Sequence, residues 1–182
     1  MPRIQPVQPT EANEKSKKLL EGVQRGMGMV PNMFKTLAQS SAALAGYLNF
    51  NQALSGALTP AQREQIALAV AGVNGCDYCA SAHTLLGSNA GISGEELTAN
   101  LVGQSSDNKT QAGLTFAIAV VERHGRVTDD DLELIKAAGF TDAQIVEIVA
   151  VVALNIFTNY FNHVADTEID FPFVDTVAAA AS

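Results

Sequence analysis

The two cysteines of this 182-residue chain lie three positions apart, at Cys76 and Cys79, and His83 follows four residues after the second. If this segment is helical, the spacing i, i+3 and i+7 places both sulfurs and the imidazole on one face. A thiol beside a base can be held as thiolate, which is the nucleophilic form of cysteine. The segment therefore predicts redox chemistry, with Cys79 as the nucleophile and Cys76 close enough to condense with the oxidised sulfur.

A carboxylate precedes this segment at Glu64, twelve residues before Cys76. If the helix that carries Glu64 folds back onto the cysteine segment, the carboxylate can orient the His83 imidazole and complete a proton relay. The alternative is that Glu64 is a solvated residue in the first turn of a helix, where the helix dipole favours an acidic side chain.

Other interpretations of the cysteines remain open. They could be an inert buried pair, or they could bind zinc together with His83 and Glu64. Zinc is the weaker alternative, because three of the ligands would share one helix and no second Cys or His pair accompanies them. A thioredoxin-like motif is excluded by context, since it requires a strand before the cysteine helix.

Composition limits the class of protein. A chain with 47% hydrophobic residues can bury a full core without disulfides, so the cysteines are not needed as structural staples. The formal net charge of -8 and the lack of a basic run disfavour nucleic acid as a partner. The first residues contain no apolar core of signal-peptide length, and the longest apolar stretch, 145–157, is short for a membrane span and contains Glu147. We expect a cytoplasmic protein that does not associate with membranes.

Helix-start and helix-stop residues recur along the chain, whereas alternating β-branched runs are absent. The phrases that begin at Thr59 and Thr141 each place an N-cap three residues before a glutamine, which is a capping-box pattern. The chain is predicted to be all-α. Helices are expected at 11–26, 31–38, 41–56, 60–74, 77–90, 94–102, 108–124, 129–138 and 142–164.

A weak internal repeat is present. Residues 59–81 align with 141–163, with matched residues at both helix starts and along one face, but the second copy has no cysteines. The helix of the second copy is apolar on nearly every side, so it needs burial on more than one face. A subunit interface would provide it.

The spacing of Glu64, Cys76, Cys79 and His83 resembles the signature of the alkylhydroperoxidase D (AhpD) branch of the carboxymuconolactone decarboxylase superfamily. The resemblance is clearest over 31–91, and 159–172 resembles uncharacterised peroxidase-related members of the superfamily. It implies an AhpD-like all-helical domain in which a helical hairpin carries the CxxC motif. It also implies homo-oligomers, often trimers or hexamers, and reduction of hydroperoxides.

By position, the resemblance makes Cys79 the peroxidatic cysteine, Cys76 the resolving cysteine, and His83 with Glu64 the proton relay. It implies a dithiol reductant, such as a lipoyl-bearing protein. No cofactor is expected, because sulfur itself can carry the electrons, and no metal is expected. A single domain is expected over 1–182, with a core at 31–165. The N-terminal arm 1–30 and the C-terminal tail 166–182 are expected in oligomer contacts.

Tyr78 stands where the best-known peroxidase of this branch has a histidine, so one acid/base group is missing. Tyr78 and His163 are candidate accessory residues, whereas His124 is expected to complement a helix end. Two further functions remain as alternatives. One is a cysteine-independent lyase or decarboxylase acting on a small carboxylated metabolite, for which the sequence indicates no cationic pocket. The other is a non-enzymatic redox sensor.

Overall fold

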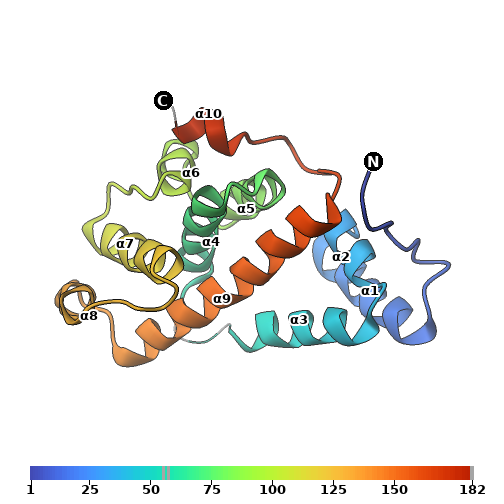
Figure 1. The fold of residues 1–182 in the computed structure, drawn as a ribbon, viewed down its shortest axis with the longest axis horizontal. Helices are drawn as coiled ribbons and strands as arrows, with labels where there is room; N and C mark the ends of the chain where they lie inside the picture. The colour runs from blue at the N-terminus through green and yellow to red at the C-terminus, as the bar shows by residue number, and fades with distance from the viewer. Residues whose placement is uncertain (55, 57, 181–182) are drawn as a thin grey trace.

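The computed structural model describes residues 1–54, 56 and 58–180, and these residues form α-helices and no strand (Figure 1). The all-α prediction is confirmed. The helices are α1 (Glu14–Met27), α2 (Asn32–Leu37), α3 (Ser41–Ala53), α4 (Pro60–Asn74), α5 (Asp77–Asn89), α6 (Gly94–Leu101), α7 (Asn108–Glu122), α8 (Asp129–Ala137), α9 (Asp142–Ala165) and α10 (Thr176–Ala180).

The helix starts follow the capping residues of the sequence. Thr59 and Thr141 form capping boxes with Gln62 and Gln144, as predicted, so α4 and α9 begin where expected. The first helix begins at Glu14 rather than residue 11, because the Asn13 side chain accepts the Ser16 N–H and caps the helix there. The third helix ends at Ala53 rather than 56, and residue 55 within the expected range lies outside the described residues.

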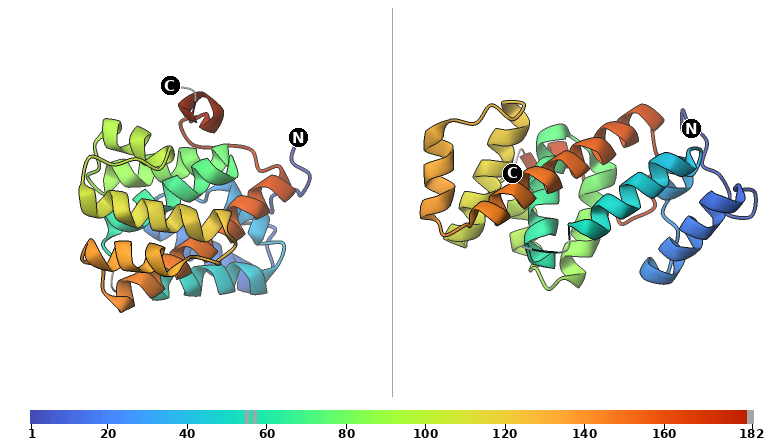
Figure 2. Two further views of the ribbon diagram at one scale, coloured as in Figure 1. Left: turned by 60° about the vertical axis from the view of Figure 1, so that its left-hand side comes forward. Right: turned by 90° about the horizontal axis from the view of Figure 1, so that it is seen from below.

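Helix α4 is the centre of the fold. It packs against α5, α6, α7 and α9, and it forms an antiparallel hairpin with α5. The hairpin turns at Gly75, whose φ of 63° is left-handed and therefore suits glycine. Helix α9 runs diagonally across the molecule beside the hairpin, with α1–α3 at one end and α7 and α8 at the other (Figures 1 and 2).

Two groups of buried apolar side chains fill the space between these helices. The first lies between α4, α7 and α9 and includes Leu114 and Ile148. The second lies between the N-terminal helices and the α4–α5 hairpin; it includes Leu20 and Leu68 and also contains Cys76 and Cys79. The thiols therefore belong to a packed core, which restricts their movement.

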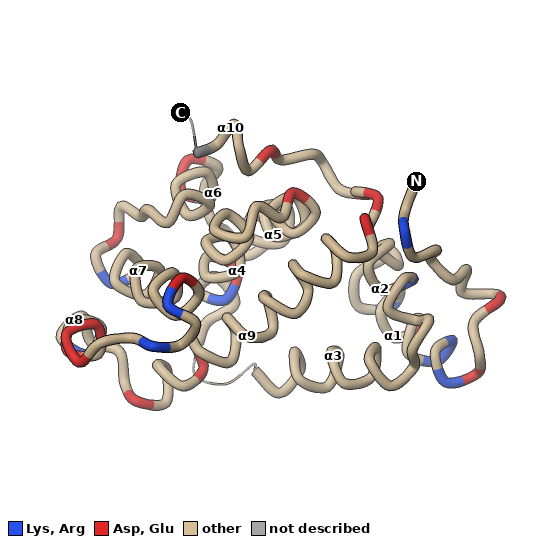
Figure 3. The backbone as a smooth tube through the Cα atoms, in the orientation of Figure 1, with Lys and Arg blue, Asp and Glu red and all other residues tan. Residues whose placement is uncertain are grey.

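Helix α9 combines a buried face with an exposed apolar face. By length and composition it could span a membrane, with a mean hydropathy of 1.5 in its most apolar window, but 44% of that window is buried inside the fold. A core helix that packs within its own chain can meet the same criteria of length and composition. Figure 3 shows that its middle carries no Lys, Arg, Asp or Glu, and α3 carries none at all.

The repeat relates the starts of α4 and α9 but does not extend further. Helix α4 ends at Asn74 and the chain turns at Gly75, whereas α9 continues without a break for 24 residues. The second copy thus lacks the turn that would begin a new helix, as well as the cysteines.

The C-terminal tail returns over α5. The Asp77 carboxylate accepts hydrogen bonds from the Thr176 N–H, at 3.0 Å, and from the Thr176 hydroxyl, at 2.6 Å, at the start of α10. Phe171 packs edge-on against Tyr78 at 5.6 Å between ring centroids, so it finds a cover within its own chain. Phe173 remains 64% exposed.

Candidate active site

The turn between α4 and α5 positions both thiols. Cys76 is the N-cap residue of α5, and its sulfur accepts a hydrogen bond from the Cys79 N–H at 3.4 Å. Cys79 lies in the first turn of α5, where the positive end of the helix dipole favours an anionic sulfur. The predicted opening of a helix by the cysteine pair is confirmed.

The two sulfurs are direct neighbours. The Sγ atoms of Cys76 and Cys79 are 2.7 Å apart, and the residues are only 1% and 3% exposed. A disulfide between them requires only a small movement of the side chains, because residues three apart on a helical turn have suitable Cα separations.

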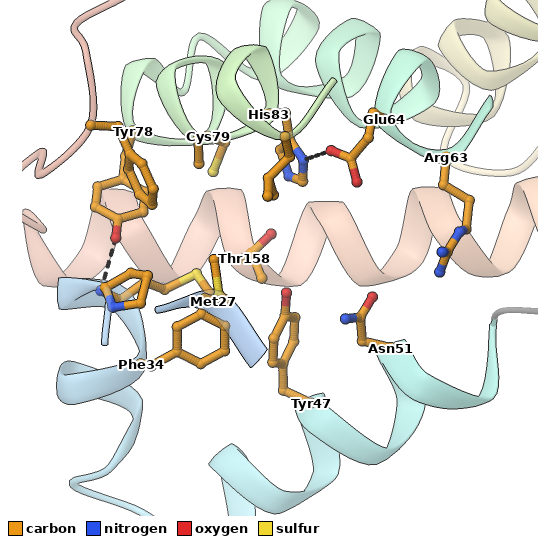
Figure 4. Close-up of a pocket in the computed structure, with 15 residues that line it drawn as sticks. Met27, Phe34, Tyr47, Asn51, Arg63, Glu64, Tyr78, Cys79, His83 and Thr158 are labelled. Atoms are coloured by element: carbon orange, nitrogen blue, oxygen red, sulfur yellow. Dashed lines mark hydrogen bonds and ion pairs between the residues drawn. The ribbon is translucent and has the colours of Figure 1, made fainter. Parts of the chain in front are cut away.

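The structure brings Glu64 to His83. The Glu64 Oε2 atom lies 2.7 Å from His83 Nδ1, and about a fifth of each side chain is exposed, at 21% and 20%. Because α4 and α5 form a hairpin, the carboxylate reaches back across it to the imidazole. Figure 4 shows His83 between Cys79 and Glu64 on one side of a cavity.

The surroundings of the two thiols give them different acidities. Burial raises the pKa of Cys79, but the hydrogen bond from Cys76, the positive charge of His83 and the amides of Asn162 and Asn159 outweigh it and lower the pKa to about 7. The hydrogen bond to Cys79, followed by burial, raises the pKa of Cys76. Cys79 is therefore the thiolate of the pair, and Cys76 is its hydrogen-bond donor.

The surroundings of His83 favour its protonated form. Burial alone lowers the pKa of His83, but the charge and hydrogen bond of Glu64 dominate, and together with Cys79 and Asn155 they raise it. A protonated imidazole beside a thiolate is the pairing that thiol chemistry requires of an acid and a nucleophile.

Helix α9 carries three asparagines, at positions 155, 159 and 162, next to Cys79 and His83. The Asn162 Nδ2 group donates to Cys79 Sγ at 3.3 Å, and Asn159 accepts a hydrogen bond from Asn74 at 2.9 Å. All three are buried. They were not among the site residues predicted from the sequence. Their spacing of four and three in an otherwise apolar helix is the signal that marks a buried polar face.

A cavity of about 280 Å³ opens onto Cys79. Apolar and aromatic side chains line most of it, and several polar side chains lie at its end near the start of α4 (Figure 4). The lining includes Met27, Met33, Phe34, Tyr47, Asn51, Arg63, Leu86 and Phe171 besides the predicted Glu64, Tyr78, Cys79 and His83. Helix α3 supplies Tyr47 and Asn51, which no local motif indicated.

Tyr78 and His163, the accessory candidates, take different places. Tyr78 lines the cavity, where burial raises the pKa of its phenol; the hydroxyl donates to Asp170 at 2.9 Å and accepts from the Met33 N–H at 3.1 Å. It is a neutral link between α5, α2 and the tail. His163 lies outside the cavity lining and contacts the Gly75 carbonyl through Nε2 at 3.3 Å.

The described part of the chain holds no group of three or more His, Cys, Asp or Glu side chains arranged for a metal ion. The four candidate residues form two pairs, sulfur with sulfur and imidazole with carboxylate.

Comparison with known families gives one match within the chain. Residues 41–123, which contain the α4–α5 hairpin and all four candidate residues, match the model of the carboxymuconolactone decarboxylase family. No curated protein matches the chain.

Solved structures share the fold over nearly the whole chain. An uncharacterised peroxidase-related protein from Ralstonia eutropha JMP134, with an alkylhydroperoxidase AhpD core, is 24% identical with a TM-score of 0.85, covering 93% of this chain and 92% of its own. A peroxidase-related protein from Silicibacter sp. TM1040 is 23% identical with a TM-score of 0.77, covering 86% and 85%. The debrominase Bmp8, whose structure was solved with 2,3,4-tribromopyrrole, is 17% identical with a TM-score of 0.79, covering 98% and 96%.

Proposed function

We propose that this chain, whose residues 41–123 match the carboxymuconolactone decarboxylase family, is a thiol-dependent peroxidase that reduces hydroperoxides through Cys79 and Cys76. The observation that carries the proposal is the asymmetry of the thiol pair. Cys79, with a pKa of about 7, faces a cavity, whereas the higher-pKa Cys76 lies behind it as the hydrogen-bond donor.

In the first step the Cys79 thiolate attacks one oxygen of the hydroperoxide. The O–O bond breaks, the sulfur is oxidised to sulfenic acid, and the departing alkoxide takes a proton and leaves as an alcohol. The protonated His83 is the donor of that proton, and Glu64 stabilises the imidazolium before the transfer. No cofactor is needed, because the sulfur carries the electrons.

In the second step the Cys76 thiol attacks the sulfenic sulfur. A disulfide forms and water leaves, which the 2.7 Å separation of the sulfurs favours. A dithiol reductant then returns two electrons and two protons, restoring both thiols. A lipoyl-bearing protein is our proposed donor.

Trapping of sulfenic acid tests the roles of the two cysteines. After one equivalent of hydrogen peroxide, Cys76→Ser should accumulate a sulfenic acid on Cys79, detected by mass spectrometry after dimedone labelling. Cys79→Ser should neither consume peroxide nor carry the label. A label on Cys76 in the Cys79→Ser variant would reverse the two roles.

Turnover separates this function from the alternatives of the sequence analysis. Peroxide consumption in many-fold excess over protein, with dihydrolipoamide as donor, distinguishes an enzyme from a redox sensor. If the double variant Cys76→Ser/Cys79→Ser retains turnover of a small carboxylated metabolite, the thiols are not the catalytic groups and the lyase alternative stands.

Reductive dehalogenation is a second candidate, supported by the aromatic cavity beside the thiolate. The Cys79 thiolate would take the bromine of a bromoarene as a sulfenyl bromide while the ring carbon gains a proton. Cys76 would then displace bromide and close the disulfide. Bromide release from 2,3,4-tribromopyrrole, compared with peroxide reduction under the same reductant, decides between the two substrates.

A further inference from the structure

One end of the cavity gathers three polar side chains that lack a partner. Among the described residues, no hydrogen bond or ion pair reaches the side chains of Tyr47, Asn51 or Arg63, and the Arg63 Nε atom is buried without a partner. A buried donor without an acceptor is costly, and native structures supply such donors with a protein group or a ligand.

The three side chains converge from two helices. Tyr47 and Asn51, one turn apart on α3, point up into the space below His83 and Glu64, and Arg63 descends into the same space from the first turn of α4 (Figure 4). A smaller hollow of about 40 Å³ next to the main cavity shares all three residues, so their polar groups border open space on two sides. This space suits an acceptor with more than one oxygen.

The charges around Arg63 favour a ligand with a single negative charge. Glu64, the nearest acidic side chain in sequence, is occupied by His83, and the described residues place no acidic group within ion-pair distance of Arg63. A guanidinium pairs well with the two oxygens of a carboxylate. A doubly charged phosphate would leave one charge unbalanced near Glu64.

The opposite end of the cavity is apolar. Met27, Phe34 and Phe171 line it near Cys79, and flexible thioether and aromatic side chains adapt to an apolar or aromatic body. The His83–Glu64 pair lies between this end and Arg63 (Figure 4). The cavity therefore has a cationic end and an apolar, reactive end.

We propose that the cavity binds a small amphipathic carboxylate, whose carboxylate pairs with Arg63 and accepts hydrogen bonds from Tyr47 and Asn51. Its apolar body lies toward Cys79. Resting on the proposed function, this makes the substrate an organic hydroperoxide that bears a carboxylate at the end remote from the peroxide. The cationic group that the sequence did not indicate is thus provided by Arg63.

Isothermal titration calorimetry with probes that carry no peroxide tests the inference. The reduced wild-type protein is titrated with 4-phenylbutanoate and with its neutral analogue 4-phenylbutanamide. We expect the carboxylate to bind at least tenfold more tightly, and Arg63→Met to weaken its binding by about 10- to 100-fold. Arg63→Lys should retain part of the affinity, because the charge remains but the bidentate geometry is lost.

Arg126→Met is the matched control, since it removes the same charge from an exposed position outside the cavity lining. Equal binding of acid and amide, no measurable binding of either, or an equal loss in Arg126→Met would each overturn the inference. The wild-type comparison decides the question even if Arg63→Met folds poorly. Because the probes are not oxidants and the sulfenic-acid experiment uses no carboxylate, failure here is distinguishable from failure of the thiol chemistry.

Discussion

At the scale of single residues, two thiols from one short phrase acquire different chemistry. Cys76 occupies the N-cap position and donates to its neighbour, whereas Cys79 receives hydrogen bonds from Cys76 and Asn162. Hydrogen bonds to the charged form lower a thiol pKa, and burial raises it. The two sulfurs therefore differ in pKa because of their hydrogen bonds rather than their exposure, since both are buried.

Alkylation rates should report this difference directly. With a pKa of about 7, Cys79 should react with iodoacetamide at a rate that rises through neutral pH, because the thiolate forms above that pKa. Asn162→Leu removes a donor to the thiolate, so the midpoint should move to higher pH by roughly one unit. The exposed substitution Asn89→Leu is the control, and the same shift there would rule out a local effect.

The His83–Glu64 pair predicts how kcat/KM for peroxide reduction falls at alkaline pH. Peroxide reduction requires Cys79 deprotonated and His83 protonated, so kcat/KM should pass through a maximum whose alkaline limb follows the raised pKa of His83. Glu64→Gln removes the charge that raises this pKa, so the alkaline limb should move to lower pH, and the rate should fall roughly 10²- to 10⁴-fold. Glu95→Gln, on the exposed start of α6, should leave the profile unchanged.

At the scale of helices, the residues with local signals were predictable. Capping residues such as Thr59 and Thr141 fix helix starts from a few neighbouring side chains, so those helices were found from the sequence. Helix α10 was not predicted, although Asp175 caps it locally by accepting hydrogen bonds from the Val177 and Ala178 N–H groups. The contact of its first residue, Thr176, with Asp77 joins positions 99 apart and has no local signal. The link between Glu64 and His83 could be proposed from spacing, but only the packing of α4 on α5 decides it.

The site residues that were missed are ones without a local signal in the sequence. Tyr47 and Arg63 reach the cavity, and Asn162 of α9 reaches the Cys79 sulfur, through contacts between helices that are distant in sequence. No local pattern specifies which face of α3 turns toward α4. Buried asparagines in an apolar helix could have been noticed, because uncharged polar residues are rarely buried without a partner.

Close packing of α4 on α6 predicts a sensitive glycine. A Cβ at Gly72 would lie 1.9 Å from the Leu101 carbonyl oxygen, so Gly72→Ala must push the two helices apart. We expect a loss of about 1–3 kcal/mol in the free energy of unfolding, measured by urea titration. Gly46→Ala on α3, where a Cβ meets nothing within 4 Å, should instead stabilise by about 0.5–1 kcal/mol. Equal effects of the two substitutions would contradict the packing argument.

At the scale of the molecule, α9 presents an apolar stripe to the outside. Val146, Val149, Phe157, Tyr160 and Val164 follow one another at helical spacing and are 42–68% exposed. Exposed apolar patches of this kind mark contact surfaces in soluble proteins. Phe50 on the neighbouring α3 is 41% exposed.

We propose that a second copy of the chain covers this stripe in a closed homo-oligomer, whether a trimer, a hexamer or a smaller assembly. Tyr160→Glu should place a charge in the interface and yield a smaller species in analytical ultracentrifugation at micromolar concentration. Leu134→Glu, at a residue on α8 that is 66% exposed, is the control and should leave the mass unchanged. A monomeric wild-type protein would disprove the assembly.

The burial of both sulfurs selects reductants by their shape. In the structure with both thiols free, Cys79 lines the cavity and Cys76 does not, and both residues are buried. A donor whose dithiol sits on a broad protein body has no approach to them. If the protein is the peroxidase we propose, a donor that carries its dithiol at the tip of a slender, extended arm can enter through the same cavity as the peroxide. The depth of the sulfurs thus separates compatible from incompatible electron donors by reach alone, before any redox potential is compared.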